Sequence, residues 1–322
     1  MSHKKRRRIK KKPVIILICI ILLIIISVKQ ISKNIKEVNY KKTDEYKLIQ
    51  VGYSKDEIKI INNKTNKEFI TYLLDNDYDK TYIDIISEKY YIKENLKKYI
   101  DYYEDNIDTK TSDIVAVINT GTNKEYYTDI KETDITKGNL LINNKYYKLP
   151  DNYQPDDLVK IKNWYSYGDN NKIKKEVYDS FLKMFEAAKK DKITLIINSA
   201  YRSEKEQKKT YDDILKNNTK EFTDKKAARP GHSEHQTGLA LDLITYGANG
   251  DNFDKTDAFI WLQNNAHEYG FILRYPKGKE YLTGYTYESW HYRYVGVEVA
   301  TAIHDNDITF DEYYAYYVKW FI

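Results

Sequence analysis

The residues whose types and spacing could carry chemistry lie in two short stretches of the second half of the chain. Residues 231–242 read GHSEHQTGLALD and contain His235 and Asp242, and residues 287–291 read YESWH and end at His291. Two imidazoles and one carboxylate suit a catalytic zinc ion, which takes three protein ligands and keeps a fourth position for water. The sequence therefore predicts a Zn²⁺ site made by these three side chains.

A fourth residue could supply the proton transfers of such a site. Glu288 lies three residues before His291 and is a candidate general base. A carboxylate beside zinc-bound water can take its proton and later return it to a leaving amine. Gly238 and Ala240, between the first two ligands, are small enough for a chain that turns closely around a metal.

The other histidines have plainer interpretations. His267 and His304 are expected to be ordinary surface or core residues, and His3 belongs to a basic N-terminal segment. His232 could lie behind the ligands, but we favour an ordinary loop residue.

Taken together, the motif residues resemble the zinc D-Ala-D-Ala carboxypeptidases of the VanY type. That family includes L,D-carboxypeptidases and shares its metal ligands with D-Ala-D-Ala dipeptidases. The resemblance covers roughly residues 140–305, and the positions that carry it are Ser233, His235, Gly238, Ala240, Asp242, Glu288, Trp290 and His291, with Tyr201-Arg202-Ser203, Gln207 and the segments 269–280 and 293–296.

The resemblance implies a role at each matching position. Zn²⁺ would be bound by His235, Asp242 and His291, and Glu288 would act as general base and acid. Arg202 would grip the free C-terminal carboxylate of the substrate, which a guanidinium matches in a bidentate manner. Ser233 and Gln207 would hydrogen-bond near the same end. The implied substrates are peptidoglycan stem peptides, from which the C-terminal D-Ala is removed.

Two alternatives remain open. The enzyme could cleave another bond, as an L,D-carboxypeptidase acting on tetrapeptide stems or as an endopeptidase. The domain could also be a zinc module that binds without catalysis, although the presence of Glu288 beside the ligand set argues against this. Nothing in the sequence indicates an oligomeric state.

Composition excludes several other classes. The single cysteine, Cys19, lies in an apolar N-terminal run, so the rest of the chain has no disulfide, no thiolate nucleophile and no cysteine ligand. Eight of the positive charges lie in residues 1–12, and without them the formal net charge of +5 becomes −3. A basic nucleic-acid-binding domain is therefore not indicated.

The N-terminus is interpreted as a segment that targets the protein to the membrane. Residues 14–28 form an uncharged apolar run, about 23 Å long as a helix, which flanking lysines and local bilayer thinning could extend to a span. A cleaved signal peptide is the rival interpretation, but no small-residue cleavage pair follows, and Ile18 before Cys19 does not suit a lipoprotein. We expect an uncleaved anchor, with residues 1–12 in the cytoplasm and residues 30–322 outside.

The predicted organisation is a tag and transmembrane anchor (1–29), a polar spacer (30–48), a small mainly helical region (49–139) and a catalytic domain (140–322). The catalytic domain is expected to have an α+β fold, with helices on a mostly antiparallel sheet around the zinc site. Helices are predicted to begin after the capping boxes at 54–57 and 203–206, and to cover 89–103, 177–188 and 259–269; strands are predicted at 113–119, 193–197, 239–244 and 287–295.

Overall fold

The computed structural model describes residues 11–168, 171–248 and 250–319. The chain divides into two compact units, Met1–Ile100 and Asp101–Ile322. The domain limits expected from the sequence, at residues 29, 48 and 139, are not decided by this division and stay a prediction.

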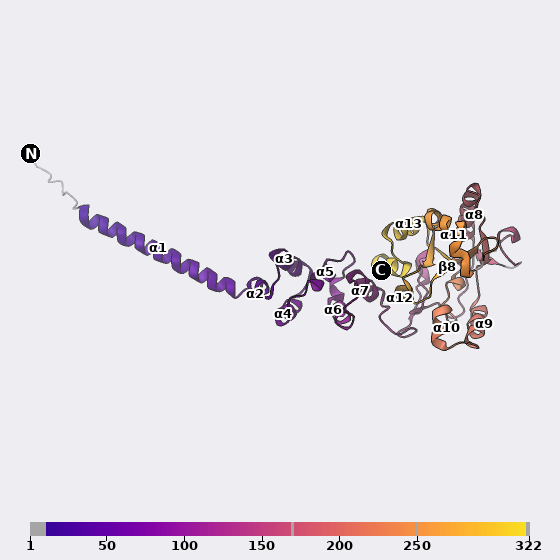
Figure 1. The fold of residues 1–322 in the computed structure, drawn as a ribbon, viewed down its shortest axis with the longest axis horizontal. Coiled ribbons are helices and arrows are strands. Elements are labelled where there is room, and N and C mark those ends of the chain that lie inside the picture. The colour runs from indigo at the N-terminus through magenta and orange to yellow at the C-terminus, as the bar shows by residue number, and fades with distance from the viewer. Residues whose placement is uncertain (1–10, 169–170, 249, 320–322) are drawn as a thin grey trace, which may run out of the picture. The chain divides into compact units, whose positions relative to one another are not determined.

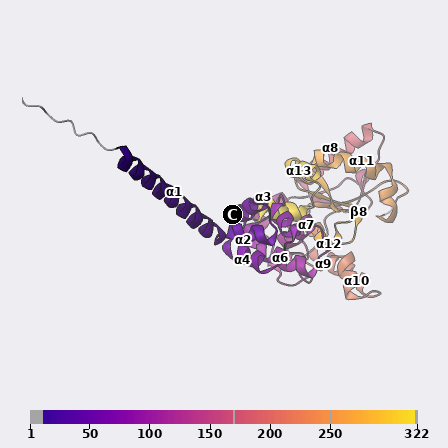
Figure 2. The same ribbon diagram turned by 60° about the vertical axis from the view of Figure 1, so that its left-hand side comes forward.

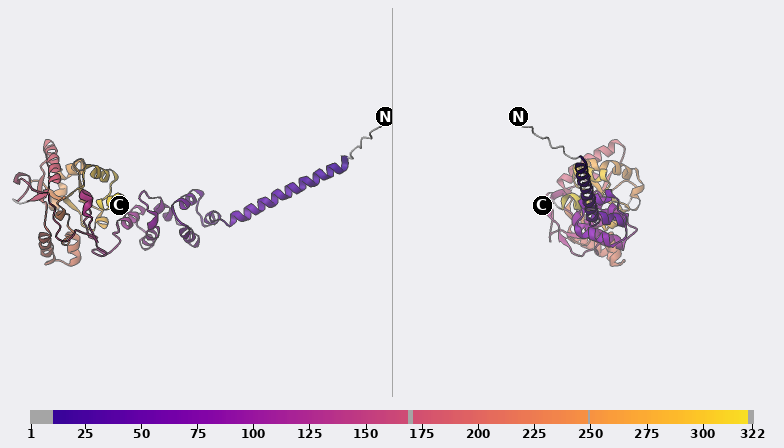
Figure 3. Two further views of the ribbon diagram at one scale, coloured as in Figure 1. Left: turned by 180° about the vertical axis from the view of Figure 1, so that it is seen from behind. Right: turned by 90° about the vertical axis from the view of Figure 1, so that its left-hand side faces the viewer.

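A single long helix, α1 (Lys11–Lys41), begins the described chain (Figure 3). Its segment Ile15–Lys41, 27 residues long, is long and apolar enough to cross a membrane. At 1.5 Å per residue this is about 40 Å, more than the ~30 Å of a hydrocarbon core. The helix also continues through much of the polar segment expected to be a spacer, whereas most of the basic tag, residues 1–10, lies outside the described residues. An apolar helix of this kind is compatible with a membrane anchor.

The rest of the first unit is made of short helices. The capping box expected at Ser54 is confirmed, because its hydroxyl accepts from the Glu57 amide while the Glu57 carboxylate accepts from the Ser54 amide. The helix expected from residue 89 begins later, after a turn of 3₁₀ helix at Lys93–Asn95. The helices are α2 (Asp44–Val51), α3 (Lys55–Lys64), α4 (Lys67–Asp75), α5 (Lys80–Ser87) and α6 (Leu96–Asp105), the last of which crosses the boundary between the units.

The strand predicted at 113–119 is wrong, because these residues form helix α7 (Thr111–Thr120). Its side chains from Ile114 to Ile118 are all buried, so the run is apolar without the polar side that would have revealed a helical period. Gly121, with φ of 80°, ends the helix as a left-handed cap, which a glycine can also do after a strand. Inside the second unit, Ala116 and Val117 pack on Leu282 of α12 (Glu280–Thr283).

The second unit is built on a four-stranded antiparallel sheet with the order β5-β6-β8-β7. Its strands are β5 (Ile196–Ser199), β6 (Ala240–Ile244), β7 (Phe271–Tyr275) and β8 (Glu288–Tyr294). Two small two-stranded sheets accompany it: β1 (Lys131–Glu132) with β2 (Tyr147–Lys148), and β3 (Leu158–Lys160) with β4 (Lys172–Lys174). The strands expected at 239–244 and 287–295 are confirmed, and the one expected at 193–197 begins three residues later, at Ile196.

Helices surround this sheet (Figure 1). The expected amphipathic helix is α8 (Lys175–Lys190), whose apolar stripe is buried, and α9 (Glu204–Leu215) begins with the expected capping box at Ser203. Figure 2 shows α9 beside α10 (Lys220–Lys226), with which it is in contact. The remaining helices are α11 (Asp257–Asn265), followed by a 3₁₀ turn to Tyr269, α13 (Val297–Asn306), α14 (Phe310–Tyr313) and a π-helical turn, η7 (Tyr314–Val318).

The two faces of the sheet have different chemistry, because side chains alternate along a strand. One face packs against α8 and α11 in the main apolar core, through Leu241, Leu243, Tyr292 and Tyr294. The alternate positions point to the other face, and they include Asp242, His291, Arg293 and Arg274. Charged residues therefore gather on one side of the sheet while the opposite side supplies the apolar support.

Within the second unit, the buried Lys145 contacts both helix α10 and the loop before β8. Lys145 donates a hydrogen bond to the Asp224 carbonyl, and its ammonium lies 3.7 Å from the ring centre of Tyr285 and 4.9 Å from that of Tyr126. Lys145 is fully buried, and burial lowers its pKa to about 7. Cation–π contacts thus replace part of the hydration that the ammonium loses.

Gly270 lies at the tight connection between the 3₁₀ turn η6 (Ala266–Tyr269) and β7, and its substitution tests how closely the chain packs there. Its φ is 85°, and a Cβ there would lie 2.6 Å from Tyr294 Cε2 and 3.1 Å from the Gly296 carbonyl carbon. Gly270→Ala should lower the free energy of unfolding by about 2–4 kcal/mol, from left-handed strain plus overpacking. Gly278→Ala is the matched control, since Gly278 has φ of 81° with open space around it, and should show the strain alone. Urea unfolding of the purified chain measures both; equal losses would contradict the close contact.

Candidate metal and catalytic site

Two strands and one 3₁₀ turn bring the predicted metal ligands together. Asp242 in β6 and His291 in β8 are direct partners across the sheet, and His235 lies in the 3₁₀ turn η4 (Glu234–Thr237). Gly238, with φ of 67°, reverses the chain between that turn and β6. Asp242 Oδ1 lies 3.4 Å from His235 Nε2 and 3.3 Å from His291 Nδ1, and the three ligand atoms lie within 4.8 Å of one another.

These residues fit a metal ion by chemistry and by spacing. In a tetrahedral zinc site with bonds of about 2.0–2.1 Å, neighbouring ligand atoms lie about 3.3–3.4 Å apart, which is the separation of Asp242 Oδ1 from each imidazole nitrogen. Among the residues that the structure describes, no donor makes a hydrogen bond to that buried oxygen. A buried carboxylate oxygen without a donor, facing two imidazole nitrogens, is suited to a cation.

The outward nitrogens of both imidazoles are held by the protein. His235 Nδ1 lies 2.6 Å from the Ala200 carbonyl oxygen, which fixes the proton there and leaves Nε2 for a metal. His291 Nε2 lies 3.4 Å from Glu234 Oε2, which leaves Nδ1 for the metal in the same way. The two rings are set perpendicular to each other, at 90°.

Glu234 belongs to a buried ionic network that sequence reasoning missed. Its Oε1 accepts from Arg274 Nε at 2.7 Å and from Arg293 Nη1 at 2.8 Å, and Arg274 also donates to Asp311 at 2.6 Å. Burial by itself raises the pKa of Glu234, but the two guanidiniums outweigh it and hold that pKa well below its usual range. The available signal was the presence of two arginines inside apolar strands, since buried guanidiniums require carboxylates.

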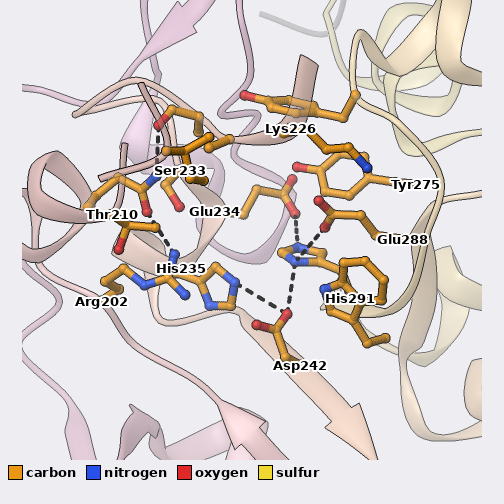
Figure 4. Close-up of a pocket in the computed structure, with 16 residues that line it drawn as sticks. Arg202, Thr210, Lys226, Ser233, Glu234, His235, Asp242, Tyr275, Glu288 and His291 are labelled. Carbon is orange, nitrogen blue, oxygen red and sulfur yellow. Dashed lines mark hydrogen bonds and ion pairs between the residues drawn. The ribbon is translucent and has the colours of Figure 1, made fainter. Parts of the chain in front are cut away.

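Glu288 stands at the start of β8, opposite Tyr275 of β7. Its Oε2 lies 3.7 Å from His291 Nδ1, and Figure 4 shows Glu288 and Glu234 next to each other on one side of His291, with Asp242 on the other side. Burial raises the pKa of Glu288 to about 7, with His291 opposing and the charge of Asp242 adding to that rise. A carboxyl group in this range can both accept and return a proton near neutral pH.

Arg202 enters the site from the junction between β5 and α9. Its guanidinium donates to Gln207 Oε1 at 2.9 Å and to Ser199 Oγ at 3.1 Å, and Gln207 Nε2 donates in turn to the Ala228 carbonyl at 2.7 Å. Within the described residues the guanidinium has no carboxylate partner. The Gln207 amide is engaged on both sides, so this side chain positions Arg202.

One cavity of about 200 Å³ contains all seven predicted site residues (Figure 4). They line it together with residues that the sequence did not single out for the site. These additional residues include Thr210, Ile214, Lys226, Tyr275 and Tyr285.

The remaining described histidines lie away from this cavity. His267 and His304 stack on each other with ring centres 3.8 Å apart. His232 is buried, with Nδ1 2.7 Å from the Asn144 carbonyl oxygen and its ring edge-on to Tyr127.

Comparison with known proteins places this chain in a family. The model of the VanY family, described as D-alanyl-D-alanine carboxypeptidase, matches residues 170–297. YodJ of Bacillus subtilis is 40% identical over 205 residues, which cover 59% of this chain and 74% of YodJ. VanXYC of Enterococcus gallinarum, a bifunctional D-Ala-D-Ala dipeptidase and D-Ala-D-Ala carboxypeptidase, is 34% identical over 55% of this chain and 94% of its own length.

A solved structure agrees with these relatives. The LD-carboxypeptidase LdcB matches with a TM-score of 0.55 and 39% identity, over 60% of this chain and 92% of that one. The resemblance inferred from the motif residues is thereby confirmed, and the chain belongs to the VanY family of D-alanyl-D-alanine carboxypeptidases.

Proposed function

We propose that this protein is a zinc-dependent carboxypeptidase that removes the C-terminal D-Ala from peptidoglycan stem peptides. The observation that carries the proposal is one cavity that holds His235, Asp242 and His291 together with Glu288 and Arg202, whose guanidinium has no carboxylate partner among the described residues. Membership of the D-alanyl-D-alanine carboxypeptidase family supports the same activity.

The metal would be held by the three ligands, and their outward nitrogens are already occupied by Ala200 and Glu234. When bound there, zinc supplies a Lewis acid that polarises the scissile carbonyl and makes water a stronger acid. Glu288 takes the proton from the attacking water and returns it to the amine of the departing alanine. Burial of Glu288 keeps the proton affinity of its carboxylate high enough for both transfers.

Arg202 makes the enzyme act on chain ends. A guanidinium presents two parallel N–H donors to a carboxylate, and in this cavity it has no acid partner of its own. Gln207 and Ser199 hold it in place, so little side-chain entropy is lost when a substrate carboxylate arrives. Ser233 lines the same cavity, and we propose that it hydrogen-bonds near this end of the substrate.

The second candidate function is L,D-carboxypeptidase activity on tetrapeptide stems, which the similarity to LdcB favours. Both reactions use the same ligands, base and carboxylate clamp. They differ in the configuration of the residue before the scissile bond.

We further propose that α1 anchors the enzyme in the membrane with the basic N-terminus in the cytoplasm. The concentration of lysine and arginine before the apolar run favours that orientation. The catalytic unit then works outside the cytoplasmic membrane, where the cell wall lies.

Stem peptides test the proposed activity directly. The zinc-loaded chain, incubated with a pentapeptide stem ending in D-Ala-D-Ala, should release one alanine, as measured by mass spectrometry. Loss of alanine from the tetrapeptide stem alone would replace this activity with the L,D reaction. If neither stem changes while zinc stays bound, a binding role gains support.

Glu288→Gln tests the proposed base. The amide has the same shape but cannot take a proton, so we expect kcat to fall by about 10²–10⁴-fold. Zinc content, measured by elemental analysis, should stay at the wild-type level, because the three ligands are untouched. Retention of more than a tenth of the activity would show that another group transfers the proton.

Glu234→Gln tests the carboxylate behind His291. Removing one partner of a buried ionic network costs about 3–5 kcal/mol, and the loss of this carboxylate should weaken zinc binding about 10–100-fold. Competition with a chromogenic chelator measures the affinity, and thermal unfolding measures the stability. Glu221→Gln is the control, since Glu221 pairs with Lys225 on the surface and its loss should change neither quantity. Wild-type zinc affinity in Glu234→Gln would leave the network with a structural role only.

A further inference from the structure

The cavity contains a second cationic side chain, which the proposed reaction does not use. Lys226 is the last residue of α10 and lines the cavity together with Glu288 and Arg202. Figure 4 shows Arg202 beside His235, whereas Lys226 lies on the side of Glu288 and Tyr275. The two cations therefore flank the ligand cluster from different ends.

Lys226 makes no salt bridge in the described part of the chain, although its charge acts across the cavity on the Glu288 carboxylate. Its neighbour Lys225, by contrast, pairs with Glu221 at 2.8 Å. Basic residues in the last turn of a helix interact favourably with the helix dipole, and this would explain either lysine. That explanation does not account for the position of Lys226, which faces the cavity.

The proposed binding of the substrate determines what Lys226 would meet. Arg202 holds the terminal carboxylate, and the scissile carbonyl lies at the ligand cluster. An extended peptide advances about 3.3–3.6 Å per residue, so the residue before the terminal D-Ala-D-Ala lies beyond the cluster, away from Arg202. On that side a lysine attracts a side-chain carboxylate and repels an amine.

We propose that Lys226 is a specificity-determining residue that favours peptides with a carboxylate on the residue before the terminal D-Ala-D-Ala over peptides with an amide or an amine there. The inference rests on the proposed function, because it assumes that peptide ends enter this cavity. The enzyme would then recognise two negative charges of the substrate, the terminal carboxylate and the side-chain carboxylate of the preceding residue.

Three acetylated peptides, Glu-D-Ala-D-Ala, Gln-D-Ala-D-Ala and Lys-D-Ala-D-Ala, test this inference with the zinc-loaded full chain in detergent. The wild-type kcat/KM should be about two- to fivefold higher for the acid than for the amide, the range of a solvent-exposed ion pair, and lowest for the amine. The preference should vanish in Lys226→Gln and reverse in Lys226→Glu. It should persist in the matched control Lys225→Gln, and about 0.5 M salt should reduce it, as a purely structural role would not.

The outcomes separate the two proposals. If the peptides are hydrolysed equally, or if Lys226→Gln keeps the wild-type order, the inference is overturned while the proposed activity stands. If no peptide is hydrolysed, calorimetric binding decides: tighter binding of the acid that depends on Lys226 supports the inference while the activity fails. Equal binding of the three, or no binding, overturns the inference as well.

Discussion

The site depends on one buried carboxylate, that of Glu234, held between two guanidiniums. Ionised groups removed from water are tolerated only when each has partners of opposite charge. An ionised Glu234 in this interior therefore requires Arg274 and Arg293, and Arg274 is in turn paired with Asp311. The network joins strands β7 and β8 to the turn η4 and to helix α14. Because Glu234 also faces His291, the ion pairs that stabilise this interior also orient the imidazole of a proposed metal ligand.

The antiparallel sheet supplies the rest of the geometry. Asp242 and His291 are direct partners in its register, so a slip by one residue would turn one of them into the apolar core. His235 comes from the turn η4, but its backbone carbonyl accepts a hydrogen bond from the Arg202 amide at 3.2 Å. This bond connects the turn that carries a proposed ligand to the arginine proposed to bind the substrate carboxylate. The proposed metal ligands and the arginine proposed to bind the substrate carboxylate are thus parts of one hydrogen-bonded frame.

Much of this arrangement could be predicted from the sequence where a local rule applies. The capping boxes at Ser54 and Ser203 and the apolar stripe of α8 follow from spacing alone. The run at 113–119 was misassigned because it is buried on all sides, and only its packing in the second unit decides between strand and helix.

In the site, the spacing of the motif residues identified the three ligand candidates and Glu288, and these four side chains line one cavity. Glu234, Arg274 and Arg293 stayed hidden because their partners are 40 or 59 residues away, and no local pattern records such pairs. The same holds for Lys226, whose position in the cavity follows from how α10 packs.

The contacts of Lys145 with aromatic rings bear on which residues the catalytic unit must include. Tyr285 forms part of the cavity wall, and its ring rests on an ammonium supplied from well before residue 170, where the family match starts. Tyr126, still earlier in the chain, completes the contact. A protein shortened to the matched segment would keep every candidate ligand and lose the contact behind one wall, so a change upstream of residue 170 can reshape the cavity without altering a motif residue.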